Sequence, residues 1–232
     1  MTANGRHLAL SGRRGTPPDW VEMSRAALGG HIELDPMSEP VFNEIVRAER
    51  IYTEQDDCFS VLWQADTLFI NPHGGLVVEA WRELSRVHRC GYVKAAIWIG
   101  FSMEQLNLLV DQVEHPMDFS MLTVRKRIDF LTTEPFRTVM SEITKGVLLL
   151  ECGHHFTVTA RKHAAAKAVR CSQCEGTPEP LGAPTHGNYV VGLGIPADRF
   201  EAAFAGRGRF SHGQFAVARA GLLDEEAFGG VA

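Results

Sequence analysis

The sequence predicts an α/β sandwich built around a parallel or mixed sheet, and three observations lead to this prediction. Short apolar segments of strand length alternate with amphipathic segments of helical length along most of the chain. One apolar segment, 93–99, is apolar on both faces, as is typical of buried strands in parallel sheets. The chain has 232 residues, of which 45% are hydrophobic, and this suffices for one domain with a core and a small insertion.

The individual elements follow from hydrophobic spacing and from the turn residues between them. A first helix is expected after Thr16 and Pro17, because apolar residues recur at helical spacing up to a pair of glycines. The expected strands occupy residues 31–34, 67–70, 93–99, part of 120–130, and 188–193. The expected helices occupy residues 20–28, 76–89, 103–112 and 197–205. Their alternation predicts a sheet that is covered by helices.

A change of composition at residue 151 marks a second unit. The segment 151–176 is rich in cysteine, histidine and basic residues, and a loop rich in proline and glycine follows it. We therefore predict an insertion before the last part of the sheet. The predicted boundaries are a flexible arm at 1–15, a main α/β domain at 16–150 and 177–210, an inserted finger at 151–176 and a C-terminal tail at 211–232.

Composition and charge exclude several classes of protein. The net charge of −5 argues against a protein that coats nucleic acid by bulk charge, but it is compatible with a local basic face. No apolar run approaches the ~18 to 20 residues of a membrane span, and the first residues lack the apolar region of a secretory signal. Five cysteines without an export signal favour metal ligation or free thiols over a disulfide framework. We expect a cytoplasmic protein with no membrane partner.

Two of the predicted strands end in similar dipeptides. Asp35-Pro36 follows the first strand, and Asn71-Pro72 follows the second. Open α/β sheets bind ligands at the carboxyl ends of their strands, so both dipeptides are candidate site residues. The alternative is that Asn71, Pro72 and the two glycines after His73 only form a turn.

Further short motifs occur in a fixed order along the chain. They are Thr16-Pro17 before a helix, IELDP, IYTEQDDCFSVLW, FINPHGG, AAIWIGFSMEQL, VRKRIDF, PTHGNYVVGLG and RFEAAF. Their order and spacing resemble those of the phage-type DNA N6-adenine methyltransferases, over residues 16 to 206 apart from the cysteine-rich insertion. The resemblance implies a Rossmann-like S-adenosylmethionine methyltransferase sandwich that acts on DNA.

The same resemblance implies roles for individual residues. Asn71 and Pro72 would accept hydrogen bonds from the target amino group, which aims the nitrogen lone pair at the methyl group of the cofactor. The residues implied to lie at the S-adenosylmethionine are Thr16, Pro17, Asp35, Pro36 and Asp57, with Asp57 in the region that faces the adenine ring.

The motif departs from the family pattern after Pro72. His73 and Gly74 replace the usual second proline and aromatic residue. His73 could stack on a flipped base in place of the aromatic ring, a contact worth ~1 to 3 kcal/mol in stacking sites. Two other interpretations stay open: a non-catalytic nucleic-acid-binding protein on a degenerate methyltransferase fold, and an enzyme that modifies another base.

The predicted insertion carries a metal-ligand pattern. Cys152 and His154 precede the pair Cys171 and Cys174, and together they supply four ligands suited to tetrahedral Zn2+. A closed site of three cysteines and one histidine is structural, because no position is left for a water molecule. The fragment resembles small zinc-ribbon modules, which favours His154 over His155 as the histidine ligand. The alternative is a set of ordinary buried cysteines near exposed histidines.

Two clusters of basic residues are candidate contacts to the DNA backbone. The predicted finger carries Arg161, Lys162, Lys167 and Arg170 with no acid among them. The second cluster consists of Arg125, Lys126 and Arg127, beside a strand candidate at 128–130. Such clusters allow a chain with a net negative charge to contact the phosphates of DNA at one place on its surface. The alternative is that both clusters are solvated surface residues.

Overall fold

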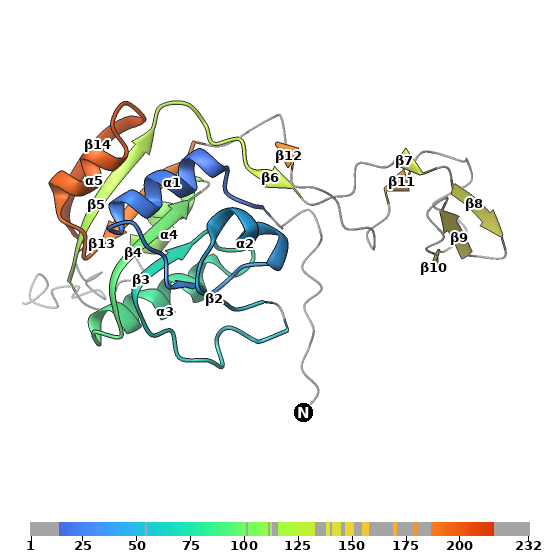
Figure 1. Ribbon diagram of the computed structural model, residues 1–232, viewed down its shortest axis with the longest axis horizontal. Coiled ribbons are helices and arrows are strands. Elements are labelled where there is room, and N and C mark those ends of the chain that lie inside the picture. Colours follow the sequence, from blue (N-terminus) through green and yellow to red (C-terminus); the bar gives the residue numbers. More distant parts are fainter. Residues whose placement is uncertain are drawn as a thin grey trace, which may run out of the picture.

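The computed structural model describes residues 14–53, 55–100, 102–110, 112, 116–132, 138–139, 141–144, 147–150, 155–157, 169–170, 179–180 and 187–215. Its main sheet consists of β1 (Leu34–Asp35), β2 (Arg50–Ile51), β3 (Ala65–Ile70), β4 (Val93–Gly100), β5 (Met117–Val124), β13 (Tyr189–Leu193) and β14 (Gly208–Phe215) (Figure 1). Across the sheet, the order of these strands is β14-β5-β13-β4-β3-β1-β2.

The sheet is mixed, with a parallel part and an antiparallel part. Strand β1 pairs in parallel with β2 and with β3, and β3 pairs in parallel with β4. Strand β13 is antiparallel to both β4 and β5, and β14 is antiparallel to β5. Strands β1 to β5 therefore all run in one direction, and their carboxyl ends lie along one edge of the sheet. We call this side the carboxyl edge.

The order of the strands reverses between β1 and β3. From β1 the chain moves outward to β2, and it then returns past β1 to β3 on the other side. Such a reversal in an open α/β sheet separates the loops that follow the two central strands and leaves a crevice between them. The loops that begin after Asp35 and at Asn71 flank this switch point.

Helices cover both faces of the sheet (Figure 1). They are α1 (Pro18–Ala27), α2 (Pro40–Val46), α3 (Val77–Arg89), α4 (Met103–Val110) and α5 (Ala197–Ala203). Buried residues of α3 and α4 share one hydrophobic cluster with the sheet, and those of α1, α2 and α5 share the other. The architecture is therefore a three-layer α/β/α sandwich.

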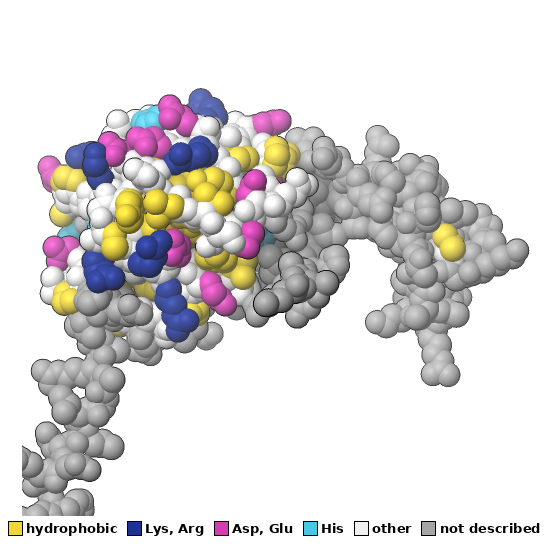
Figure 2. Space-filling view, turned by 90° about the horizontal axis from the view of Figure 1, so that it is seen from below, with side chains coloured by type: hydrophobic (Ala, Val, Ile, Leu, Met, Phe, Trp, Pro, Cys, Tyr) yellow, Lys and Arg dark blue, Asp and Glu magenta, His cyan; other side chains and the backbone are white. Residues whose placement is uncertain are grey.

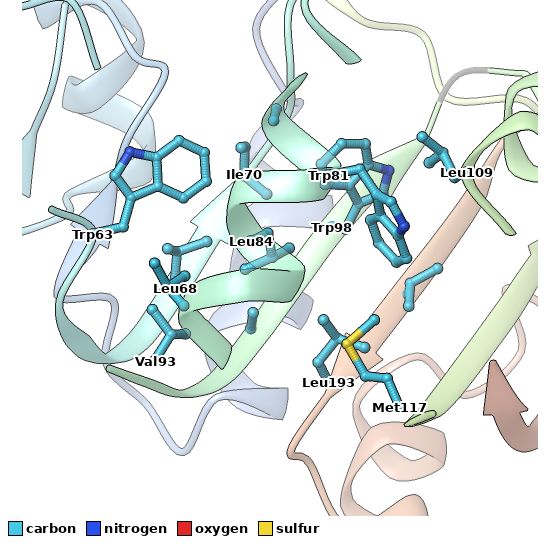
Figure 3. Packing of buried hydrophobic residues seen from close by; sticks show 14 of the residues in the cluster. Trp63, Leu68, Ile70, Trp81, Leu84, Val93, Trp98, Leu109, Met117 and Leu193 are labelled. Atoms are coloured by element: carbon cyan, nitrogen blue, oxygen red, sulfur yellow. The ribbon is translucent and has the colours of Figure 1, made fainter. Parts of the chain in front are cut away.

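Helix α3 shows how apolar spacing positions the sheet. Its buried side chains recur every three or four residues, at Val77, Ala80, Trp81, Leu84 and Val87. They pack against side chains of β3 and β4 (Figure 3), and the rings of Trp81 and Trp98 meet edge to face with 5.1 Å between their centroids. This packing fixes the end of β3, and with it the residues that follow.

The predicted fold class is confirmed as a mixed α/β sandwich that is compatible with a Rossmann-like fold. The strands and helices expected from hydrophobic spacing are present within a few residues of their predicted positions. Helix α2 and strand β14 are not predicted by the sequence, which places residues 211–232 in a tail. Strand β14 is an edge strand with mostly exposed side chains, so its sequence shows no apolar alternation.

Short strands between β5 and β13 form smaller sheets apart from the main one. Strand β6 (Leu131–Thr132) pairs with β12 (Glu179–Pro180), β7 (Thr138–Val139) pairs with β11 (Val169–Arg170), and β8 (Ser141–Thr144), β9 (Val147–Leu150) and β10 (His155–Thr157) form an antiparallel sheet. The four predicted zinc ligands lie outside the described residues. Within the described part of the chain, no helix is long and apolar enough to span a membrane.

Candidate functional site

Two predicted site residues lie at the carboxyl edge, on either side of the switch point. Asp35 is the last residue of β1, and Asn71 follows the last residue of β3, which is the neighbouring parallel strand. A cavity of about 20 Å³ lies between the two following loops. Its lining consists of Arg14, Met37, Glu39, Phe42, Asn71, Pro72 and His73.

Asp35 is a buried carboxyl group with neutral partners. Its side chain is only 4% exposed, and the backbone N–H of Met37 donates a hydrogen bond to Oδ1 at 3.3 Å. Burial raises the pKa of Asp35 to about 7, and the hydrogen bond from the Met37 N–H counteracts this rise only in part. Among the described residues Asp35 forms no ion pair, so a bound cation would stabilise its ionised form.

Asn71 is held by the backbone of a segment far away in the sequence. Its side-chain nitrogen Nδ2 donates a hydrogen bond of 2.7 Å to the carbonyl oxygen of Arg14. Gly15 then pairs with Leu131 through two backbone hydrogen bonds, of 2.9 and 2.8 Å. The Arg14–Thr16 segment therefore runs along the carboxyl edge beside Asn71. With Nδ2 engaged in this way, the side-chain oxygen is the atom of Asn71 left to accept hydrogen bonds.

Thr16 brings a buried hydroxyl group to the same segment. The residue is 3% exposed, and its Oγ1 has no hydrogen-bond partner among the described residues. An unsatisfied buried hydroxyl costs ~1 to 3 kcal/mol, so this atom is a candidate ligand contact. Pro17, which is half-buried, occupies the N-cap position of α1 and fixes the start of that helix.

The remaining predicted residues of this site divide into two groups. Pro36 and Pro72 are buried and come directly after Asp35 and Asn71 in the sequence. Pro72 and His73 line the small cavity. Asp57 does not line it. Asp57 is exposed, has a positive φ of 45°, and accepts a hydrogen bond of 2.7 Å from the Ser60 hydroxyl, so it stabilises its own turn.

The basic residues after β5 also lie at the carboxyl edge. Arg125, Lys126 and Arg127 are exposed there. The N–H of Arg125 donates to the carbonyl of Arg207 at 2.8 Å, and Arg209 of β14 lies opposite Thr123 of β5. The strand pairing thus adds two arginines to the cluster. Hydrophobic spacing does not reveal them, because the pairing joins segments that are distant in the sequence.

Arg207 differs from the other cations of this cluster because it is already engaged. Its guanidinium pairs with the carboxylate of Asp19 at 3.1 Å and lies 5.4 Å from the ring centroid of Trp20. Arg125, Lys126 and Arg209 form no ion pair with any described residue. These three side chains are therefore available to an anionic partner.

The predicted metal site and finger lie largely outside the part of the chain that the structure describes. This holds for Cys152, His154, Cys171 and Cys174, and for the basic residues Arg161, Lys162 and Lys167. Arg170 belongs to β11, and only its backbone is described. Within the described residues, no group of three or more His, Cys, Asp or Glu side chains could hold a metal ion.

A larger cavity of about 620 Å³ lies along α3, away from the predicted residues. It is lined by side chains of α3 together with Met117 at the start of β5, so it opens toward the opposite edge of the sheet. Viewed from the α3 side, Figure 2 shows acidic and basic side chains interspersed around hydrophobic ones. The described residues of this face form no extended patch of one charge, and the carboxyl edge remains the better candidate site.

Comparison with protein-family models, curated proteins and solved structures finds no match for this chain.

Proposed function

We propose that the chain is a DNA adenine-N6 methyltransferase that uses S-adenosylmethionine and carries a structural zinc finger. One observation supports this proposal above the others. Asp35 and the Asn71-Pro72 dipeptide lie at the carboxyl ends of adjacent parallel strands, on either side of the switch point of the sheet. The sequence resemblance gives the first a role at the cofactor and the second a role at the target amine, and these two roles require neighbouring positions.

Asn71 has the chemistry that an exocyclic amino group requires. Its side-chain nitrogen donates a hydrogen bond to the carbonyl of Arg14. Its side-chain oxygen is therefore the acceptor that can take a hydrogen bond from an N–H of the substrate. The backbone carbonyl of Pro72 would accept from the other N–H. Together they would hold the nitrogen lone pair toward the methyl donor, which is catalysis by positioning and electrostatics.

The edge offers groups that fit a positively charged cofactor. The carboxyl of Asp35 would face the cationic end of S-adenosylmethionine, and the unsatisfied hydroxyl of Thr16 would hydrogen-bond to it. The cofactor would supply the methyl group. The cavity of about 20 Å³ is far smaller than the ~300 Å³ or more of small-molecule sites. Binding would therefore require the side chains that line the cavity to move.

DNA would approach the same edge. Arg125, Lys126 and Arg127 would contact phosphates there, and the finger would add Arg161, Lys162, Lys167 and Arg170. The zinc ion, held by Cys152, His154, Cys171 and Cys174, would stabilise the finger and take no part in the chemistry.

Mass spectrometry of nucleosides tests the activity. DNA incubated with the protein and isotopically labelled S-adenosylmethionine should contain labelled N6-methyladenine. Asn71→Ala should abolish the transfer but leave the affinity for the cofactor within about threefold, because Asn71 contacts the target amine. Asn107→Ala, which changes an exposed asparagine of α4, is the matched control and should retain the wild-type rate. Full activity of Asn71→Ala would contradict the role of Asn71.

The small cavity and the His73-Gly74 replacement favour one second candidate, a non-catalytic nucleic-acid-binding protein on the same fold. Thermal unfolding in the presence of S-adenosylmethionine separates the two proposals. An enzyme should be stabilised by the cofactor. A non-catalytic protein should unfold at the same temperature with or without the cofactor and should still bind DNA.

A further inference from the structure

We propose that the backbone of Arg14 and Gly15 is a positioning element that fixes the side-chain amide of Asn71 in one orientation. The inference builds on the proposed function, because the orientation decides what Asn71 can offer to a substrate. Arg14 and Gly15 are far from Asn71 in the sequence. Arg14 acts through its backbone carbonyl, and Gly15 acts because it has no side chain.

The first step concerns the amide group. An asparagine side chain has nearly the same shape when its oxygen and nitrogen exchange places, so shape alone does not decide which atom faces a partner. The carbonyl oxygen of Arg14 can only accept a hydrogen bond, and it lies 2.7 Å from Nδ2 of Asn71. The carbonyl therefore selects the orientation in which Oδ1 is left to accept a hydrogen bond from a ligand.

The second step concerns the position of that carbonyl. Gly15, the next residue, exchanges two backbone hydrogen bonds with the buried Leu131, at 2.9 and 2.8 Å. These bonds anchor the Arg14–Thr16 segment to β6. Because the carbonyl of Arg14 belongs to the peptide unit that Gly15 completes, a shift of Gly15 would move the carbonyl relative to Asn71.

The third step explains why residue 15 is a glycine. A Cβ atom at this position would lie 2.3 Å from two ring atoms of Phe42, which is itself only 7% exposed. The φ angle of Gly15 is not positive, so the requirement is for space and not for an unusual backbone conformation. Any side chain at residue 15 would push the segment away from Phe42, and with it the carbonyl that Asn71 contacts.

Steady-state kinetics and NMR on Gly15→Ala test the inference. We expect kcat for DNA methylation to fall by about 10²-fold, with KM for a duplex oligonucleotide within about threefold, because the amide is misplaced after the substrate is bound. The side-chain amide protons of Asn71, assigned by comparison with Asn71→Ala, should exchange with solvent roughly fivefold faster than in the wild type. Replacing Gly213 by Ala is the matched control, because its Cβ would meet only the ring of Phe119 at 3.4 Å.

A double variant shows whether the effect comes from the predicted clash. Combining Gly15→Ala with Phe42→Ala removes the obstructing ring and should restore most of kcat and the slow exchange of the Asn71 amide protons. Thermal unfolding of each variant identifies those that remain folded at the assay temperature. The inference is overturned if Gly15→Ala alone keeps the wild-type kcat and amide exchange. It is also overturned if the folded double variant recovers neither quantity.

Asn71→Asp provides a second test that does not depend on residue 15. Its carboxylate oxygen would replace Nδ2 opposite the Arg14 carbonyl, and two acceptors cannot form a hydrogen bond. Protonation of the new carboxyl restores a donor, so the rate of Asn71→Asp relative to wild type should increase as the pH falls from 8 to 5. A ratio of rates that is near one and independent of pH would overturn the inference. If even the wild type does not methylate DNA, the proposed function fails, and the amide exchange still tests the positioning.

Discussion

At the scale of single residues, Asp35 is the group whose protonation couples most directly to the fold. Burial raises its pKa from the usual value of 3.8 to about 7, so the folded protein keeps this proton at pH values where the unfolded chain has lost it. The stability of the fold is therefore highest with respect to this group below pH 4. It decreases as the pH rises toward 7, and above that the full cost of a buried carboxylate is present.

The variant Asp35→Asn tests this cost. It keeps an acceptor for the Met37 N–H but cannot ionise, so it should lack the loss of stability that ionisation of Asp35 causes as the pH rises. We expect its free energy of unfolding, relative to wild type, to rise by about 3 to 4 kcal/mol between pH 4 and pH 8. Urea unfolding at several pH values measures this difference, with Asp118→Asn as an exposed control. A difference that does not change with pH would contradict the buried ionisation.

The sequence predicts residues at strand ends better than it predicts their partners. Asp35 and Asn71 are found because hydrophobic spacing shows where a strand stops, and the stopping points of parallel strands share an edge. The bond from Asn71 to the Arg14 carbonyl spans 57 positions of the sequence, and the partner atom belongs to the backbone. No property of the Arg14 side chain could have indicated it. Asp57 shows another limit, since its place in a motif says nothing about the local turn that it forms.

At the scale of elements, β14 shows where apolar patterning fails. The strand lies at the edge of the sheet and most of its side chains are exposed, so the sequence predicts a tail from residue 211, where the last five of the eight paired residues of the strand lie. Its last residue, Phe215, is the one residue of this strand that is buried. Phe215 is 5% exposed, stacks on Phe119 with 4.2 Å between ring centroids, and meets Trp81 edge to face at 5.4 Å.

Truncating Phe215 should therefore destabilise the whole domain. We expect Phe215→Ala to lower the free energy of unfolding by about 3 to 4 kcal/mol, because it removes a ring from the cluster around α3 and leaves a cavity. Ser211→Ala, an exposed change on the same strand, should stay within about 0.5 kcal/mol of wild type. Denaturant unfolding measures both. Equal stabilities of the two variants would show that residue 215 does not belong to the core in solution.

The predicted insertion at 151–176 is a second element, and its prediction comes from the spacing of its four candidate metal ligands. We expect about one zinc ion per chain, which elemental analysis of protein purified without chelators would measure. Cys171→Ser or Cys174→Ser should release the metal and leave the main sheet folded, as judged by circular dichroism. Cys90→Ser, which changes an exposed cysteine of the main domain, should retain the metal. Protein without zinc would exclude the proposed site.

At the scale of the whole molecule, the distribution of charge matters more than its sum. The chain has a net charge of −5, and many described cations are paired with acids, as in Arg47 with Glu22 and Lys94 with Asp66. At the carboxyl edge, by contrast, Arg125, Lys126 and Arg209 form no ion pair within the described part of the chain. Unpaired cations that lie near one another repel, and a polyanion bound at this edge would relieve that repulsion.

The salt dependence of DNA binding tests whether this cluster is a phosphate contact. Each neutralised phosphate releases counterions, so replacing Arg125 and Arg209 by glutamine should reduce the slope of log affinity against log salt by up to ~2. Replacing Arg82 and Arg89 of α3 by glutamine changes the net charge equally at the opposite edge and should leave the slope unchanged. Fluorescence anisotropy with a labelled duplex measures both slopes. If the first variant keeps the wild-type slope, or if the second loses as much as the first, the attraction is not localised at the carboxyl edge. The duplex would then have to reach Asn71 through contacts made by the predicted finger. In that case the full reduction of the salt slope should appear when the basic residues of the finger are neutralised, namely Arg161, Lys162, Lys167 and Arg170.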